Sequence, residues 1–146
     1  MKNTFGSNLT VTIIGESHGP VVGCVIDGIS PGIKVDEDYI AARMAERQAR
    51  GDISTPRHEA DIPEILSGVK DGYTEGTPIL ITVKNENTNS ASYLSYEFTP
   101  RPGHADLTAE YKYHGYQDKR GGGHFSGRVT AALVAAGALI RSALES

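Results

Sequence analysis

The sequence predicts an α+β fold in which an antiparallel sheet, built from two hairpins, packs on buried helices. Two pairs of short apolar segments, each pair separated by turn residues, predict the strands. A long Ala-rich segment near the C-terminus predicts a helix that is apolar nearly all round and should therefore be buried. Together these features indicate a layered α+β arrangement, and the length of 146 residues suits about one domain with a real core.

The first hairpin is expected from strands at residues 9–14 and 21–26. Apolar and polar residues alternate in the first segment, whereas the second is a continuous apolar run. The connecting loop, Gly15–Pro20, holds an acid followed by Ser17 and His18. Because chemistry is usually placed on loops held by a rigid scaffold, His18 is a candidate functional residue. The alternative is a solvated imidazole in a surface turn.

A helix is expected to begin after Asp36, its N-cap, and to end just before Gly51. Three arginines, Arg43, Arg47 and Arg50, fall on one face of it. This face could clamp a carboxylate or a phosphate, which the planar guanidinium binds better than lysine does. The alternative is a solvated face stabilised by ion pairs within the helix.

The second hairpin is expected from strands at residues 64–69 and 78–83, joined by a Gly-containing turn. The irregular segment before it, residues 53–63, places His58 beside Glu59 and Asp61, which invites a weak metal-site hypothesis, but no metal-ligand spacing such as HExxH follows. The polar stretch at residues 84–100 is expected to be a long loop, of the kind that is usually functional or disordered.

Two helices are expected in the C-terminal part of the chain. Asp106 is predicted to cap a short helix that reaches Tyr113, and Ser126 to cap a longer one that reaches about Leu144. The longer helix has no charged residue between positions 129 and 138, so its small side chains should allow close packing on both sides.

A triple glycine, Gly121–Gly123, precedes the longer helix, and Arg128 follows within its first residues. Exposed glycine amides, a helix N-terminus and a guanidinium direct positive charge at the same volume, which favours an anion. The alternative is an ordinary flexible loop before a capped helix.

Composition narrows the classes of function. The net charge of −4 argues against a general binder of nucleic acid or of a membrane surface. The single cysteine, Cys24, lies in an apolar run, which predicts a buried thiol and fits a reducing cytoplasm. The N-terminus has no apolar signal region, and no run is expected to span a bilayer.

Four motifs, taken in order, resemble those of chorismate synthase: GESHGPVVGCVIDG at 15–28, TPRHEADIPEILSGV at 55–69, RPGHAD at 101–106 and RGGGHFSGRVTAALVAAGAL at 120–139. The resemblance covers essentially the whole chain. It implies part of a β-α-β sandwich, with helices between two antiparallel sheets. Because members of that family are more than twice as long, residues 1–146 are expected to be the N-terminal portion of such a domain, with its C-terminal half absent.

The resemblance also implies a reaction. The family eliminates phosphate from 5-enolpyruvylshikimate 3-phosphate in an anti-1,4 sense to give chorismate, in the shikimate pathway of aromatic amino acid biosynthesis. This carbon–oxygen lyase requires reduced FMN, although no net redox change occurs, and NADPH is a candidate for reducing the flavin. The family assembles as a homotetramer, so the implied partners are the small-molecule substrate and further copies of the chain.

Site residues follow from the resemblance, motif by motif. His18 resembles the histidine that protonates the leaving phosphate, and His104 the one that protonates the reduced flavin. The residues that match FMN contacts are His124, Phe125 and Ser126, those that match substrate contacts are Ser17, Arg47 and Arg128, and no metal ligand is implied. The chain departs from the family pattern at Ala45, Glu46, Asp52, His124 and Val129.

Two other interpretations remain open at the level of sequence. The first is a catalytically incomplete fragment that acts only as a folded, self-associating module. Because its apolar helix lacks a covering layer, such a fragment could form a homodimer that imitates the two halves of the sandwich. The second is a metal hydrolase that uses some of the five histidines and nearby acids.

Overall fold

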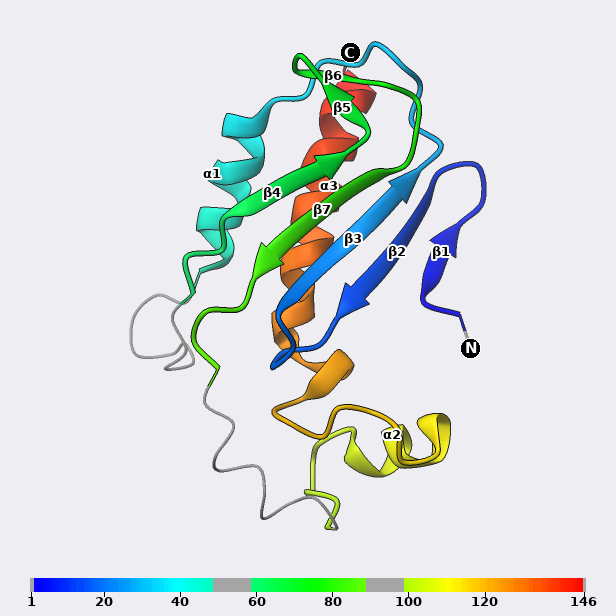
Figure 1. The fold of residues 1–146 in the computed structure, drawn as a ribbon, viewed down its shortest axis with the longest axis vertical. Coiled ribbons are helices and arrows are strands. Elements are labelled where there is room, and N and C mark those ends of the chain that lie inside the picture. The colour runs from blue at the N-terminus through cyan, green and yellow to red at the C-terminus, as the bar shows by residue number, and fades with distance from the viewer. Residues whose placement is uncertain (1, 49–58, 89–98, 146) are drawn as a thin grey trace.

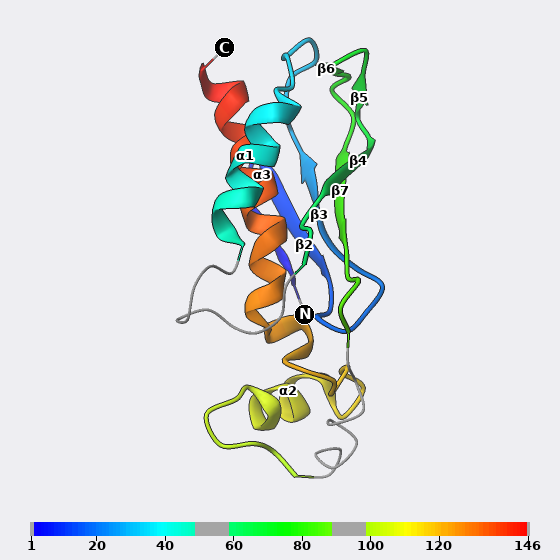
Figure 2. The ribbon, with the colours of Figure 1, turned by 90° about the vertical axis from the view of Figure 1, so that its left-hand side faces the viewer.

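The computed structural model describes residues 2–48, 59–88 and 99–145. It consists of a five-stranded antiparallel sheet in the order β1-β2-β3-β7-β4, with a small two-stranded sheet of β5 and β6 (Figure 1). Helices α1 and α3 lie together on one face of the large sheet, and α2 lies beyond its end (Figure 2). The predicted α+β class, with a sheet of hairpins packed on helices, is confirmed.

The strands are β1 Thr4–Gly6, β2 Thr10–Gly15, β3 Val21–Asp27, β4 Pro63–Ser67, β5 Val69–Lys70, β6 Tyr73–Thr74 and β7 Ile79–Lys84. The helices are α1 Glu37–Arg47, α2 Asp106–Tyr113 and α3 Thr130–Glu145, with short 3-10 turns at Gly123–Phe125 and Gly127–Val129.

Both predicted strand pairs are present. Strand β2 pairs with β3 from Thr10 opposite Asp27 to Gly15 opposite Val22. Strand β4 pairs with β7, with a register shift after Ile65. Pairing of β3 with β7 then joins the two units into one sheet. The loop that carries Ser17 and His18 therefore lies at the end of the sheet near α2 (Figure 1).

The core lies between the sheet and the two helices. Alternate residues of β3, namely Val22, Cys24 and Ile26, are fully buried and face α1 and α3 together with their neighbours on β7. Alanines of α3 pack against them, and these small side chains let the helix backbone lie close to the sheet. Burial raises the pKa of the Cys24 thiol to about 12, which agrees with the predicted buried cysteine.

Helix α3 is buried on one face only, whereas the sequence predicted burial nearly all round. Leu133 is 43% exposed and Leu144 81% exposed, and Gly137 between them is exposed as well. These residues form a stripe on the side away from the sheet, which the exposed Arg141 interrupts between Gly137 and Leu144. The expectation that no segment could span a bilayer also needs correction, because Gly127–Glu145 is long and apolar enough by length and composition. The core helix of a soluble protein meets the same criteria of length and composition.

Four predicted helix boundaries involve a cap or a stop residue, and two of them belong to α1. Asp36 is the N-cap of α1 as expected, and its carboxylate accepts a hydrogen bond from the amide of Tyr39 at 2.9 Å. The helix ends at Arg47, with Gln48 as the C-cap, and therefore stops earlier than the predicted end before Gly51, a residue outside the described ranges.

The other two boundaries concern α2 and α3. Asp106 is not an N-cap but the first residue of α2, because its carboxylate binds Arg101 instead of the helix amides. Ser126 does act as a cap, since its hydroxyl accepts a hydrogen bond from the amide of Arg128 at 3.2 Å. The turn that it caps, Gly127–Val129, leads directly into α3.

Candidate active site

Two loops that are distant in sequence meet at the end of the sheet near α2: the Gly15–Pro20 loop and the triple-glycine segment. The amide of Ser17 donates a hydrogen bond to the carbonyl oxygen of Gly123 at 3.1 Å. Ser17 is fully buried, and its hydroxyl lies 3.1 Å from Nδ1 of His18. The structure therefore brings two predicted site residues against the predicted anion loop.

Gly121 is the point of closest contact between these loops. A β-carbon placed there would lie 2.4 Å from two atoms of the His18 ring and 2.7 Å from the Ser17 hydroxyl oxygen. The φ of Gly121 is also +59°, a left-handed conformation that favours glycine. Both the space and the backbone conformation therefore require glycine, and the backbone at this position lies directly against the imidazole.

His124 and Phe125 follow on the same loop. Nδ1 of His124 lies 2.8 Å from the carbonyl oxygen of Gly15. Because a carbonyl can only accept, Nδ1 carries the hydrogen, which fixes the tautomer of the neutral ring. Phe125 is 44% exposed and lies 6.0 Å from the ring of Tyr113, with the ammonium of Lys112 at 5.6 Å.

A cavity of about 790 Å³ opens between β2, the glycine loop and α2. The rings of Tyr113 and Phe125 line it, as do His124 and the backbone of Gly121–Gly123. Gly121 thus lines this cavity while it also contacts His18. The cavity combines flat apolar walls with the backbone of the glycine loop, in which Gly121 and Gly123 are buried and their carbonyl oxygens accept hydrogen bonds from Arg101 and Ser17. Walls that are mostly apolar with a few polar groups are typical of sites for cofactors and other small molecules.

The RPGHAD motif lies beside this cavity. Arg101 donates from Nε and Nη2 to the Asp106 carboxylate at 2.7 and 2.9 Å, and also from Nη2 to the carbonyl oxygen of Gly121. These hydrogen bonds hold the pKa of Asp106 at about 2. Arg101 therefore ties this motif to the glycine loop.

His104 is placed differently from the other predicted residues. It lies on an exposed turn before α2, where Nδ1 donates to the carbonyl oxygen of Pro102 at 3.2 Å. Within residues 2–48, 59–88 and 99–145, it neither hydrogen-bonds to the His18 loop nor lines the cavity.

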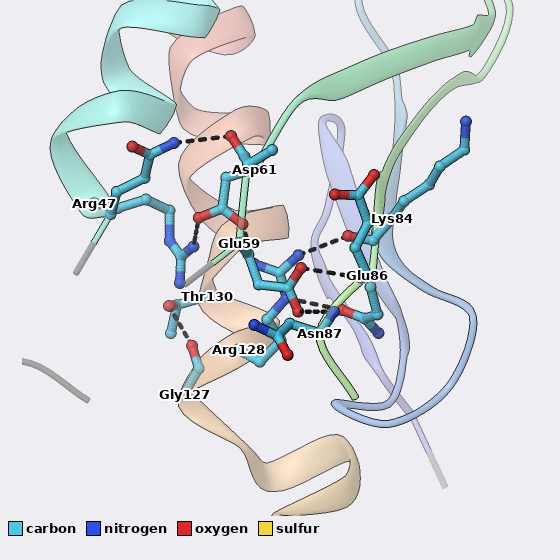
Figure 3. Close-up of polar contacts among 12 residues, drawn as sticks. Arg47, Glu59, Asp61, Lys84, Glu86, Asn87, Gly127, Arg128 and Thr130 are labelled. Atoms are coloured by element: carbon cyan, nitrogen blue, oxygen red, sulfur yellow. Dashed lines mark hydrogen bonds and ion pairs between the residues drawn. The ribbon is translucent and has the colours of Figure 1, made fainter. Parts of the chain in front are cut away.

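The two arginines predicted to bind substrate share one carboxylate (Figure 3). Arg47 from α1 and Arg128 from the turn before α3 both form ion pairs with Asp61, which is only 5% exposed. Arg128 also donates from Nε to Oδ1 of Asn85 and from Nη2 to the carbonyl oxygen of Lys84, at 2.8 and 2.9 Å. One carboxylate against two guanidiniums leaves the cluster with net positive charge.

Arg43, which was predicted to share the arginine face, is engaged elsewhere. It forms an ion pair with Glu46 at 2.5 Å and stacks over the ring of Tyr39. This agrees with the solvated-face interpretation for Arg43. The third arginine of that face, Arg50, and also His58 and Asp52, lie outside the described residues.

Sequence reasoning missed three residues of this region: Asp61, Asn85 and Arg101. Asp61 was considered only as a weak metal ligand, yet its partners are Arg47 and Arg128. Its left-handed backbone, with φ of 52°, is unusual for a residue other than glycine, but no local sequence pattern predicts it. Among the described residues, no three His, Cys, Asp or Glu side chains are grouped as ligands of a metal ion would be.

The fold and this geometry define a class of protein. A helix-covered antiparallel sheet carries at one end an imidazole, a glycine loop and an arginine cluster, residue types that suit an anionic small molecule. A sequence model of chorismate synthase matches residues 9–146 of the chain. The chain belongs to the chorismate synthase family.

Individual relatives agree with this assignment. The chain is 49% identical to the chorismate synthase of Aeropyrum pernix over 143 residues, which is 98% of this chain and 38% of that protein. It is 49% identical to that of Pyrococcus abyssi over 96% of this chain and 39% of that protein. It is 47% identical to the chorismate synthase of Chitinophaga pinensis over 97% of this chain and 43% of that protein.

A crystal structure of chorismate synthase matches with a TM-score of 0.63 and 29% identity, covering 94% of this chain and 34% of that one. The chain therefore spans about two fifths of the length of these relatives.

Proposed function

We propose that the protein catalyses the anti-1,4-elimination of phosphate from 5-enolpyruvylshikimate 3-phosphate to give chorismate, within the shikimate pathway. Family membership supports this reaction, and the packing of Gly121 on His18 and Ser17 is the observation that carries it. That contact unites the first and last motifs in one site. Residues 1–146 are proposed to be the N-terminal portion of the domain.

His18 is proposed as the acid for the leaving group. When the carbon–oxygen bond to phosphate breaks, the departing oxygen gains charge, and a proton donated from the imidazole neutralises it. Histidine suits this role because its unperturbed pKa lies close to neutral pH. The buried Ser17 hydroxyl, 3.1 Å from Nδ1, is proposed to orient the ring and to contact the substrate.

Arg47 and Arg128 are proposed to bind the anionic groups of the substrate. The ion pairs with Asp61 hold both guanidiniums in place before substrate arrives, so that less side-chain entropy is lost on binding. A guanidinium has five N–H donors, and the protein acceptors around Arg128 engage three of them. The two remaining N–H groups are proposed to contact a substrate oxygen, although the Arg128 side chain is only 6% exposed.

The 790 Å³ cavity fits the flavin that the family implies. Phe125 and Tyr113 offer flat apolar contact, and the backbone of Gly121–Gly123 offers polar groups. His124, Phe125 and Ser126 are proposed to hold reduced FMN, which would supply electron density to the reacting centre. Of these three residues, His124 and Phe125 line this cavity, whereas the Ser126 hydroxyl caps the turn before α3. His104 is proposed, from the resemblance alone, to protonate the reduced flavin, although it does not line this cavity. NADPH as reductant, a cytoplasmic location and a homotetramer complete the proposal.

Turnover measured without oxygen tests this function. The protein, reduced FMN and substrate should release phosphate and form chorismate in equal amounts, and His18→Ala should lower kcat by about 100-fold or more. His114→Asn is the matched control, because His114 is exposed at the end of α2 and asparagine tolerates its left-handed backbone. An active His18→Ala variant would remove the assignment of His18 as the acid.

A second candidate, the folded module without turnover, is favoured by the exposed stripe on α3. Calorimetric titration with FMN and with substrate separates the two candidates. Heat of binding from both ligands supports the enzyme, and no heat from either leaves only the module.

A further inference from the structure

Asn85, the first residue after β7, makes an unusual set of contacts. Its Nδ2 donates to the carbonyl oxygens of Glu16 and Gly19 at 3.0 and 2.8 Å, and its Oδ1 accepts from Nε of Arg128 at 2.8 Å. The carbonyls only accept and the guanidinium only donates, so the orientation of the amide group is determined. Both amide hydrogens and the amide oxygen are thus engaged.

The two carbonyls flank Ser17 and His18 in the chain. The loop is also closed by a hydrogen bond from the amide of Gly19 to the oxygen of Glu16, at 3.1 Å. The backbone amide of Asn85 donates to Pro20 at 3.0 Å, immediately beyond the loop. Asn85 therefore fixes the residues on both sides of the turn that presents the His18 imidazole.

The position of Asn85 is itself fixed by neighbouring groups. The carboxylate of Glu59 accepts hydrogen bonds from the amides of Glu86 and Asn87, at 3.0 and 3.2 Å, and anchors the backbone just after Asn85 (Figure 3). On the other side, Asp61 forms an ion pair with Arg128, whose Nε donates to the amide oxygen of Asn85. A chain of contacts thus runs from Asp61 through Arg128 and Asn85 to the His18 loop.

We propose that Asn85 is a positioning residue that sets the place of His18 relative to Arg128. This inference rests on the proposed function, in which His18 gives a proton to a phosphate that Arg128 helps to bind. Proton transfer requires donor and acceptor to approach within hydrogen-bond distance, and a misplacement of about 1 Å can cost about 100-fold in rate.

The contacts of Asn85 lie beyond the elements that stabilise the fold. Six residue pairs join β2 to β3, and β3 also pairs with β7 along its length, so the hairpin is held without the amide. Loss of the amide should therefore move the loop tip more than it weakens the fold.

Asn85→Asp is the sharp test, because it keeps an oxygen for Arg128 and replaces the two N–H donors with a charge that repels the carbonyls. We expect kcat to fall about 100-fold, with KM changed less than about 3-fold. Asn8→Asp makes the same chemical change at an exposed residue of the turn between β1 and β2, which lies at the opposite end of the sheet from the β2–β3 loop (Figure 1), and should leave kcat and KM unchanged. Asn85→Ala, which adds no charge, should also lower kcat more than it raises KM.

A second readout does not depend on turnover. The imidazole signals of His18, read by NMR, should shift in Asn85→Asp and stay in place in Asn8→Asp. If the wild type were inactive yet these signals shifted, the positioning role of Asn85 would be supported and only the proposed reaction would fail. Wild-type kcat together with unmoved His18 signals in Asn85→Asp would overturn the positioning role. Loss of the folded circular dichroism spectrum in both Asn85 variants would also overturn it, because Asn85 would then be needed for folding.

Discussion

Substituting Gly121 by alanine perturbs the contact on which the site depends. The new methyl group would lie 2.4 Å from the His18 ring and 2.7 Å from the Ser17 hydroxyl, while real β-carbon contacts lie above about 3.0 Å. The left-handed backbone adds about 1 kcal/mol of strain, and the crowding about 1 to 3 kcal/mol. We expect the free energy of unfolding to fall by about 2 to 4 kcal/mol.

Urea unfolding followed by circular dichroism measures this change, and Gly137→Ala is the matched control. A β-carbon at Gly137 would meet no atom within 4 Å, and this residue lies inside α3. The control should therefore gain about 0.5 to 1 kcal/mol, since alanine favours the helix. Equal stability of Gly121→Ala and the wild type would refute the packing of the glycine loop on His18.

Three further outcomes are expected. The Cys24 thiol, with its pKa near 12, should resist a thiol reagent at pH 8 in the folded chain and react once the chain is unfolded; rapid reaction of the folded chain would show that it is not buried. Asp106→Asn should cost about 2 kcal/mol at pH 7, because the folded pKa near 2 lies below the unfolded value. That contribution is complete above about pH 4 and is lost as pH falls toward 2, so the stabilities of wild type and variant should converge there; a gap that is constant with pH would contradict the Arg101 pairing. Light scattering at micromolar concentration should show self-association of residues 1–146, which Leu133→Asp on the α3 stripe should weaken, and a monomeric wild type would count against this use of the stripe.

Local patterns predicted most of the fold because the longer strands and the helices each carried their own signal. The alternation in β2, the apolar run of β3 and the Asp36 cap all specify structure from within a few residues. Strand β1 was missed, since three residues are too few for a period to be visible. The β5–β6 hairpin was missed for the same reason, although Asp71 and Gly72, both with positive φ, form the two-residue turn that such hairpins prefer.

The candidate site was only partly predictable. His18 and the triple glycine were visible as loop residues, but their contact joins positions more than a hundred residues apart. The role of Asp61 depends on Arg128, 67 residues away, and that of Asn85 on carbonyls 66 and 69 residues away. Asp106 was assigned as a cap because aspartate commonly serves there, whereas Arg101 competes for its carboxylate. Contacts between side chains that are distant in sequence produce no periodic pattern, so local sequence patterns cannot predict them.

The His18 loop and the glycine loop are proposed to form one site for the phosphate of the substrate. An NMR titration with 5-enolpyruvylshikimate 3-phosphate tests it most directly. The His18 ring signals and the amide signals of Gly121–Gly123 should shift together and saturate at the same concentration. Shifts confined to one of the two loops, or found only elsewhere in the chain, would contradict the claim.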